Sequence, residues 1–350
     1  MKNYLVLFLL LFLMISCKSI PIISIKIPKV AKLDTLISDQ ISIRALSLSN
    51  NKVYYGGNQS RVGYKSLLDA SKFERKIQYD SLVFEFRSCG VTKDYAFFLN
   101  VGNPAVMYRF SKDLIVKEIV YTEKNEKVFY DSMQFWDDQE GIAIGDPTES
   151  CLSIIITRDA GKTWNKIPCE KLPKIVDGEA AFAASNTNVV VKGNRTWIVT
   201  GGKKARVFYS SDRGMKWTVY NTPIVQGKTM TGIFSADFYD EQIGIIVGGD
   251  YENQQQKSGN KALTTDGGKT WKLIAEQNGF GYASCVQFVP GGQGNKIVSV
   301  GTSGVFVSID KGTNWSQLSD DSSFYTVRFL NATTAILAGK NKIVRMILSE

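Results

Sequence analysis

The sequence predicts an all-β fold, a seven-bladed β-propeller of four-stranded antiparallel blades. A box with the pattern hydroxyl-x-Asp-x-Gly-x-x-Trp occurs four times, at intervals of 53, 54 and 44 residues. The segments between the boxes alternate apolar and polar residues and are broken by Gly, Asn and Asp, which is typical of short strands joined by turns. Four such strands in roughly 45 residues make one propeller blade.

The four boxes are interpreted as repeated turns. A catalytic residue is normally needed once, whereas an element that recurs at a regular period is usually structural. Asp and Ser/Thr side chains can hydrogen-bond the backbone of a tight turn, Gly permits positive φ there, and Trp anchors the strand that follows. The box residues are Asp159, Trp164, Asp212, Trp217, Asp266, Trp271, Asp310 and Trp315.

Stepping from box to box gives seven blades in a single domain, residues 39–350. Asp69 and Asp113 occupy the box position in two worn copies that lack the Gly and the Trp. The seventh blade begins near Phe324, and the chain stops before a fourth strand is reached. We therefore expect a strand within residues 17–38 to complete the last blade and close the ring, because closure removes a free sheet edge.

The N-terminus has the features of an export signal. Residues 1–16 contain one Lys and an apolar run too short to cross a bilayer as a helix, which indicates a signal peptide. Ser16-Cys17 resembles the bacterial lipoprotein signal, in which Cys17 is lipidated and begins the mature chain. Plain secretion is the alternative. We thus expect an exported lipoprotein of the bacterial cell envelope, with the inner or outer membrane left open.

Cysteine and histidine content limits the chemistry. Cys151 and Cys169 flank one predicted hairpin and are candidates for a disulfide, which export permits. Cys89 and Cys285 lie in non-adjacent blades, so we expect them to be free thiols. The chain has no His and no metal-ligand spacing, so no metal, no cofactor and no His-based catalysis is expected.

The boxes resemble the Asp-box (BNR) repeats of sialidase-type propellers. The stretch "GGKKARVFYSSDRGMKW" is similar to blades of the photosystem II assembly factor family and its bacterial relatives, and the resemblance covers about residues 40–350. It implies a non-enzymatic, monomeric scaffold that binds a protein partner and assists assembly of a membrane complex. Asp-boxes also occur in hydrolases, so they are specific for the fold and weak evidence for function.

The alternative is a sialidase-type glycoside hydrolase or a glycan-binding propeller. The resemblance implies three arginines for a carboxylate, a Tyr–Glu nucleophile pair and an acid/base Asp. Arg44, Arg87 and Arg328 are the arginines that an alignment of blades brings toward the central channel. The Arg-Ile-Pro motif of sialidases has its nearest match in Lys26-Ile27-Pro28. No catalytic residue is assigned.

Variation among blades indicates a partner-binding face on the side away from the boxes. Asp146 and Asp250 follow the second strands of two blades, and the blade between them carries Lys203, Lys204 and Arg206 at this point. The prediction is a basic cluster between two acidic positions. Solvated hairpin tips are the alternative interpretation.

Polar residues also recur at one level of the strands that surround the axis. Aligning these strands on their apolar ends matches Ser47, Glu85, Gln134, Asp237, Gln287 and Arg328, with Ala183 as the apolar exception and Arg87 beside Glu85. The hypothesis is a polar channel mouth that receives a peptide tail or a small ligand. The alternative is a water-filled channel without a ligand.

Charge points to the kind of partner. The net charge of +9 favours an acidic partner or an anionic membrane surface. Nucleic acid is not expected, because the basic residues are spread along an exported chain without an aromatic–basic platform. Two hypotheses remain: a lipid-anchored, non-enzymatic scaffold for an envelope protein, and a sialidase-type enzyme.

Overall fold

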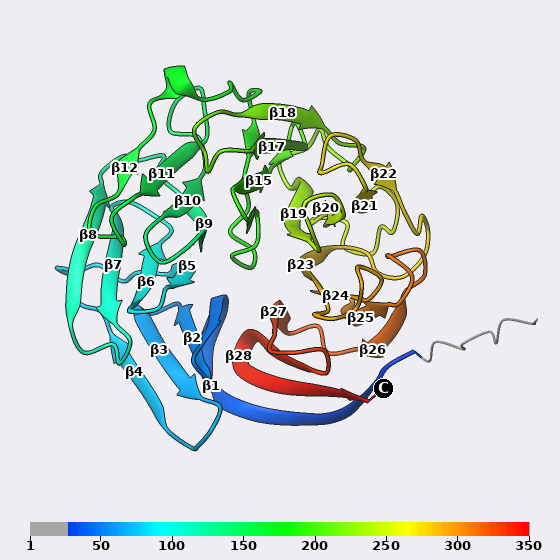
Figure 1. Cartoon of the computed structure of the whole chain (residues 1–350), viewed down its shortest axis with the longest axis horizontal. Coiled ribbons are helices and arrows are strands. Elements are labelled where there is room, and N and C mark those ends of the chain that lie inside the picture. The colour runs from blue at the N-terminus through cyan, green and yellow to red at the C-terminus, as the bar shows by residue number, and fades with distance from the viewer. Residues whose placement is uncertain (1–26, 350) are drawn as a thin grey trace, which may run out of the picture.

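A computed structural model describes residues 27–349, in which β-strands surround a central axis (Figure 1). The fold is an all-β propeller, as the sequence predicts. The predicted signal peptide, Cys17 and residues 18–26 lie outside the described residues. Within residues 27–349, no helix is long and apolar enough to cross a membrane.

The strands form six antiparallel sheets, which are the blades of the propeller (Figure 1). One six-stranded sheet contains β27 (Phe324–Phe329), β28 (Thr334–Ser349), β1 (Lys29–Ser49), β2 (Lys52–Gly57), β3 (Arg61–Ser66) and β4 (Lys72–Lys76). A second six-stranded sheet contains β13 (Glu179–Ala180), β16 (Gly201–Gly202), β19 (Thr231–Phe238), β20 (Gly244–Asp250), β21 (Lys261–Thr264) and β22 (Lys272–Leu273).

Four sheets have four strands each. The first has β5 (Phe86–Val91), β6 (Tyr95–Asn100), β7 (Ala105–Ser111) and β8 (Lys117–Glu123). The second has β9 (Tyr130–Phe135), β10 (Gly141–Gly145), β11 (Ser153–Thr157) and β12 (Asn165–Lys166). The third has β14 (Val189–Lys192), β15 (Arg195–Val199), β17 (Arg206–Ser210) and β18 (Thr218–Asn221). The fourth has β23 (Ala283–Phe288), β24 (Ile297–Gly301), β25 (Gly304–Ser308) and β26 (Ser316–Ser319).

The predicted count of seven blades is wrong, because the structure has six sheets. The segments expected to form the first and last blades share one sheet, and two long strands join them. β28 pairs with β27 through Ala335–Gly339 and with β1 through Lys340–Ser349. β1 in turn pairs with β28 through Lys29–Ser42 and with β2 through Ile43–Ser49. The N-terminal strand therefore pairs with the end of the chain, but within a shared sheet.

The box turns join the last two strands of their sheets. In the first box, the Thr157 hydroxyl donates to Asp159 Oδ1 at 2.9 Å and accepts from the Gly161 amide at 3.0 Å. Gly161 has a φ of +73°, which a residue with a Cβ rarely adopts. The other boxes repeat the hydroxyl–Asp bond at 2.8 Å, between Ser210 and Asp212, Thr264 and Asp266, and Ser308 and Asp310. Each box Asp is therefore used inside its own turn.

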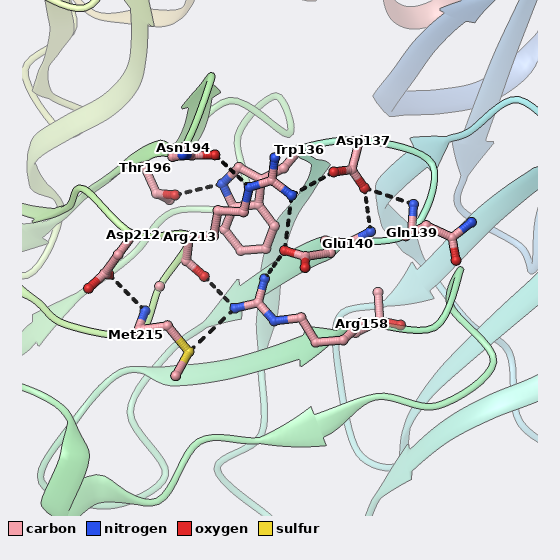
Figure 2. A network of polar contacts seen from close by, with 12 residues as sticks. Trp136, Asp137, Gln139, Glu140, Arg158, Asn194, Thr196, Asp212, Arg213 and Met215 are labelled. Atoms are coloured by element: carbon pink, nitrogen blue, oxygen red, sulfur yellow. Dashed lines mark hydrogen bonds and ion pairs between the residues drawn. The ribbon is translucent and has the colours of Figure 1, made fainter.

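A network of polar contacts joins two blades on the side of the box turns (Figure 2). Arg158 and Arg213, from consecutive boxes, both pair with Glu140, and Arg213 also pairs with Asp137 at 2.6 Å. The Arg158 guanidinium lies 5.1 Å from the centre of the Trp136 ring. Exposed ion pairs contribute roughly 0–1 kcal/mol each, so we assign this network a supporting role between blades.

The hydrophobic cores lie between neighbouring sheets. Trp197 of β15 stacks on Phe238 of β19 with ring centroids 3.8 Å apart, and Phe97 of β6 packs on Phe135 of β9 at 4.8 Å. Such contacts combine residues from two adjacent blades in one cluster. The stability of each blade therefore depends on its neighbours, as in other repeat architectures.

The cysteines fall into two classes. Cys151 and Cys169 form a disulfide, with Cα atoms 5.5 Å apart, which ties the turn before β11 to the short 3-10 helix η1 (Cys169–Lys171) after β12. Cys89 and Cys285 are free and buried. The disulfide thus clips a single blade.

Two residues of β1 test how this strand packs in the six-stranded sheet that it shares with β28 and β2. Ile37 is 5% exposed within a hydrophobic cluster, whereas Leu33 on the same strand is 50% exposed. We expect Ile37→Asp to lower the free energy of unfolding by about 3 kcal/mol or more, because it buries an unpaired charge. Leu33→Asp should change it by less than about 1 kcal/mol. Urea unfolding of both variants checks this, and equal losses would contradict the packing described.

Candidate functional site

A β-bulge recurs at the same level of six strands that face the axis. In each, the hydrogen-bonding register with the next strand skips one residue. The skipped residues, here called the bulge ring, are Arg44 of β1, Arg87 of β5, Asp131 of β9, Phe234 of β19, Ser284 of β23 and Tyr325 of β27. Bulges re-aim side chains and are over-represented next to functional sites. The bulge ring therefore marks the axis as the candidate site.

One loop crosses the axis and closes it. Residues 181–188, the axial segment, precede β14, and the green loop below β15 reaches the middle of the ring (Figure 1). Ser185 Oγ donates to Ser284 O at 2.6 Å, and Asn186 Nδ2 donates to Cys89 O at 2.8 Å. Thr187 Oγ1 donates to Ser235 Oγ at 2.8 Å. The segment thus binds strands on several sides of the axis.

The axial segment separates two pockets. The larger pocket, here called the ring pocket, has a volume of about 400 Å³. It is lined by Ala180 and by residues 181–184 of the axial segment, among others. The smaller, of about 260 Å³, is lined by Asn186 and lies toward the apolar ends of the strands. The expected open channel is therefore divided into two blind pockets.

The ring pocket has an aromatic side. Phe182 of the axial segment stacks on Phe234 with ring centroids 3.9 Å apart, and Tyr282 meets Phe234 edge-on at 4.8 Å. Tyr251, in the insertion after β20, meets Tyr282 at 5.0 Å. The remaining lining residues are Arg44, Arg87, Phe129, Asp146, Ala180, Ala181, Ala183, Ala184, Thr229 and Met230. A pocket of this size and apolar character can hold a few residues of a peptide or a small ligand.

Two arginines also line the ring pocket. Arg44 Nη1 donates to Ala184 O of the axial segment at 3.0 Å, and its guanidinium lies 4.0 Å from the centre of the Tyr325 ring. Arg87 is held by Glu85 through two bonds of 2.8 and 3.1 Å. The charge of Arg87 is therefore largely compensated, whereas Arg44 contacts a carbonyl and a ring.

Two carboxyl groups stand beside Arg87. Asp131 is fully buried, and neither of its oxygens has a hydrogen-bond partner among residues 27–349. Burial and the nearby Asp146 charge raise the pKa of Asp131 well above its usual value. Burial also raises the pKa of Asp146 to about 7, although its Oδ1 accepts from the Ala181 amide at 2.8 Å. At neutral pH this corner of the pocket thus carries at least one proton that an exposed pair would lose.

The predicted basic cluster is not assembled as expected. Arg206 pairs with the buried Glu179 at 2.5 Å, and Asp250 pairs with Lys228 at 3.1 Å and caps the insertion that follows. The Lys203 amide donates to Gly178 O, and its side chain is exposed, while Lys204 is partly exposed. Of the five residues named for this face, only Asp146 lines the ring pocket.

The predicted polar channel mouth is also divided. Gln134, Asp237 and Gln287 accept hydrogen bonds from the next strand around the axis, at Val191 (3.3 Å), Phe288 (2.7 Å) and Phe329 (2.7 Å). They act as latches between strands. Ser47 of β1 also links two strands, but as a donor, because its hydroxyl donates to Cys89 O of β5 at 2.9 Å. Only Arg87 of this group, with Glu85 as its partner, belongs to the ring pocket.

Arg328 lies on the far side of the axial segment. Its guanidinium donates to Ser185 O at 3.0 Å, to Asn186 O at 3.2 Å and to Val327 O at 2.8 Å. It lines the smaller pocket, away from Arg44 and Arg87. The three arginines of the sialidase-type alternative are therefore not brought together.

Sequence reasoning missed most of the bulge ring. Asp131, Phe234, Ser284 and Tyr325 were not singled out, nor was the axial segment. A usable signal is present, because each bulge residue lies four positions before the last apolar residue of its strand, as in Asp131 before Phe135. The alignment that selected Glu85 had the wrong register, because the other aligned polar residues lie three positions after their bulge residue, and in β5 that position is Gly90.

The buried Asp131 predicts a pH-dependent effect on stability. Because its folded-state pKa is raised, the folded chain binds more protons than the unfolded one, and stability falls as the pH rises from about 4 through that pKa. We expect Asp131→Asn to stabilise the protein at pH 7.5 by about 1 kcal/mol or more, with a much smaller gain at pH 4.5. Thermal melts at both pH values check this. The exposed Asp320→Asn is the control, and a gain independent of pH would contradict the prediction.

Comparisons with known proteins agree on the fold. The Sortilin-Vps10 family model (Sortilin, neurotensin receptor 3) matches residues 152–280, and no curated protein matches the chain. The structure titled YCF48 bound to D1 peptide is 13% identical and covers 93% of this chain and 100% of its own, with a TM-score of 0.65. YCF48 from Cyanidioschyzon merolae is 12% identical, covering 91% and 98%, with a TM-score of 0.64.

A glycoside hydrolase has the same architecture. The GH74 xyloglucanase from Xanthomonas campestris is 11% identical, covers 89% of this chain and has a TM-score of 0.66. This chain spans about half of that enzyme, 53% of its length. At such identities the likeness to a peptide-bound propeller and to a hydrolase propeller shows the fold alone.

Proposed function

We propose that this protein is a β-propeller scaffold of the cell envelope that holds a segment of a partner protein in the ring pocket. The observation that carries the proposal is the ring pocket itself. Three residues of the bulge ring, Arg44, Arg87 and Phe234, line it together with the axial segment, and it combines an aromatic side with Arg44. The similar propeller described as YCF48 bound to D1 peptide supports a peptide as the ligand.

Export and lipid anchoring belong to the same proposal. They rest on the signal-like residues 1–16 and on Cys17. The direction of β1 supports them, because Lys29 pairs with Ser349, at the end of the sheet opposite Gly339 and the bulge of β27. A tether that enters at Lys29 therefore leaves the ring pocket on the opposite side of the propeller, accessible to a partner.

Photo-crosslinking in cells tests the binding surface. A photoreactive phenylalanine analogue at Thr229, an exposed residue that lines the ring pocket, should give a discrete adduct with one envelope protein. The same analogue at Met215, exposed on a box turn, is the matched control and should not give this adduct. Identical adducts from both positions, or none from Thr229, would count against the proposal. In that case a glycan-binding screen is the next step, because it addresses the alternative function.

Fractionation tests the anchor. The wild-type protein should sediment with membranes and incorporate a labelled fatty acid, whereas Cys17→Ser should do neither, because the acylated side chain is lost. Ser19→Ala is the control and should behave as the wild type. A Cys17→Ser protein that stays in the membrane fraction would show that another feature holds it there.

A further inference from the structure

The geometry points to a specific ligand chemistry for the ring pocket: a carboxylate joined to an aromatic group. Arg44 binds the carboxylate, and the aromatic group packs on the side formed by Phe182 and Phe234. The inference rests on the proposed function and names the part of the partner that enters the pocket. Two sources share this chemistry, the C-terminal aromatic residue of a protein and a free aromatic acid.

Arg44 is the cation available to such a ligand. Its guanidinium makes one hydrogen bond, to Ala184 O, and has no carboxylate partner in the part of the chain that the structure describes. By contrast, Arg87 beside it is neutralised by Glu85. A guanidinium has five N–H donors in a planar fork that matches a carboxylate. Stacking on Tyr325 and the bond to Ala184 fix its orientation before a ligand arrives.

The aromatic side of the ring pocket favours a flat apolar group. Phe182 and Phe234 are nearly parallel, with an interplanar angle of 6°. Tyr282 meets Phe234 edge-on at 85° and Tyr251 edge-on at 82°. Small residues, alanines 180, 181, 183 and 184, line the same pocket. Aromatic pairs prefer such offset-stacked and edge-to-face arrangements, so a further ring can extend the cluster.

The protonation of Asp131 and Asp146 determines the net charge at the ring pocket. Asp146 faces Asp131 of β9, Arg87 of β5 with its partner Glu85, and Arg44 of β1 across the pocket. Arg44 has no carboxylate partner among the described residues, so it attracts an anion, and no negative charge on Asp146 opposes that anion while Asp146 is protonated. Because the pKa of Asp146 is about 7, the negative charge that appears above this pH opposes an anionic ligand. Binding should therefore weaken between pH 6 and pH 8.

The test uses the purified full-length protein and a defined probe. N-acetyl-phenylalanine and its C-terminal amide differ only in their terminal group, which is a negatively charged carboxylate in the acid and a neutral carboxamide in the amide. We expect the acid to bind about 10- to 100-fold more tightly than the amide at pH 6, the range for a hydrogen-bonded charged group. Isothermal titration calorimetry measures both. Equal affinities of acid and amide for the wild type would overturn the inference without recourse to any variant.

Matched variants locate the carboxylate. Arg44→Gln should abolish the preference for the acid. Arg75→Gln is the control, because Arg75 also donates to backbone carbonyls, at Leu114 and Ile115, and lies over the Phe110 ring, far from the ring pocket. Asp146→Asn should remove the difference between pH 6 and pH 8. An Arg75→Gln variant that loses as much acid preference as Arg44→Gln would contradict the assignment.

Two further outcomes separate this inference from the proposed function. A tripeptide ending in Phe that binds more tightly than N-acetyl-phenylalanine supports a protein terminus as the source, whereas weaker binding supports a free aromatic acid. If Thr229 crosslinks to a partner and the acid has no advantage, the scaffold function holds and the ligand chemistry is wrong. If the acid binds and no partner is crosslinked, the ligand chemistry holds and the pocket serves a small molecule.

Discussion

Hydrogen bonding between the axial segment and the surrounding strands is the constraint on which the rest of this structure depends. Residues 181–188 contact β1, β5, β9, β19, β23 and β27 through Arg44, Cys89, Met133, Ala236, Ser284 and Thr326. Most buried polar groups in proteins are hydrogen-bonded, and here the partners of the axial segment come from strands far apart in sequence. The segment consists mainly of Ala, Ser, Asn and Thr, because only small side chains fit at the centre of the ring.

The β-bulges are the second constraint. Regular alternation would direct each residue of an axial strand either into a core between blades or toward the neighbouring strand. One extra residue per strand breaks this alternation and frees one side chain at the level of the ring pocket. The pocket therefore draws part of its chemistry from a position that is repeated around the axis, and the identity of that residue in β1, β5 and β19 contributes to its asymmetry. Arg44 and Arg87 give one side its charge, and Phe234 gives the other its apolar surface.

The features that could be predicted from the sequence are local. A box turn is defined by bonds between residues two to four positions apart, as in Thr157, Asp159 and Gly161, so the spacing alone determines its structure. The disulfide candidate also followed from a short hairpin. The blade count was wrong because β1 and β28 each pair with two different strands along their length, and a repeat period does not contain that information.

The site could be predicted only in part, because its contacts are long-range. Arg206 was expected to face a partner, but its charge is taken by Glu179, which is 27 positions away and buried. Gln134, Asp237 and Gln287 were expected at the axis; each accepts a hydrogen bond from a neighbouring strand, and Gln134 also lines the smaller pocket. A bulge shifts the register by one residue, and alternation cannot reveal this before the pairing partner is known.

Closure of the axis has a topological consequence. Since the axial segment and Arg328 block the middle of the ring, no polypeptide can thread through this propeller. Whatever occupies the ring pocket must enter and depart through the same opening, so a resident must leave before a successor arrives. Occupancy is then one molecule per propeller, and exchange between two competitors is limited by departure of the first. A threaded ring would retain a chain until its free end passed, whereas this blind pocket can release its occupant from the middle of an assembly.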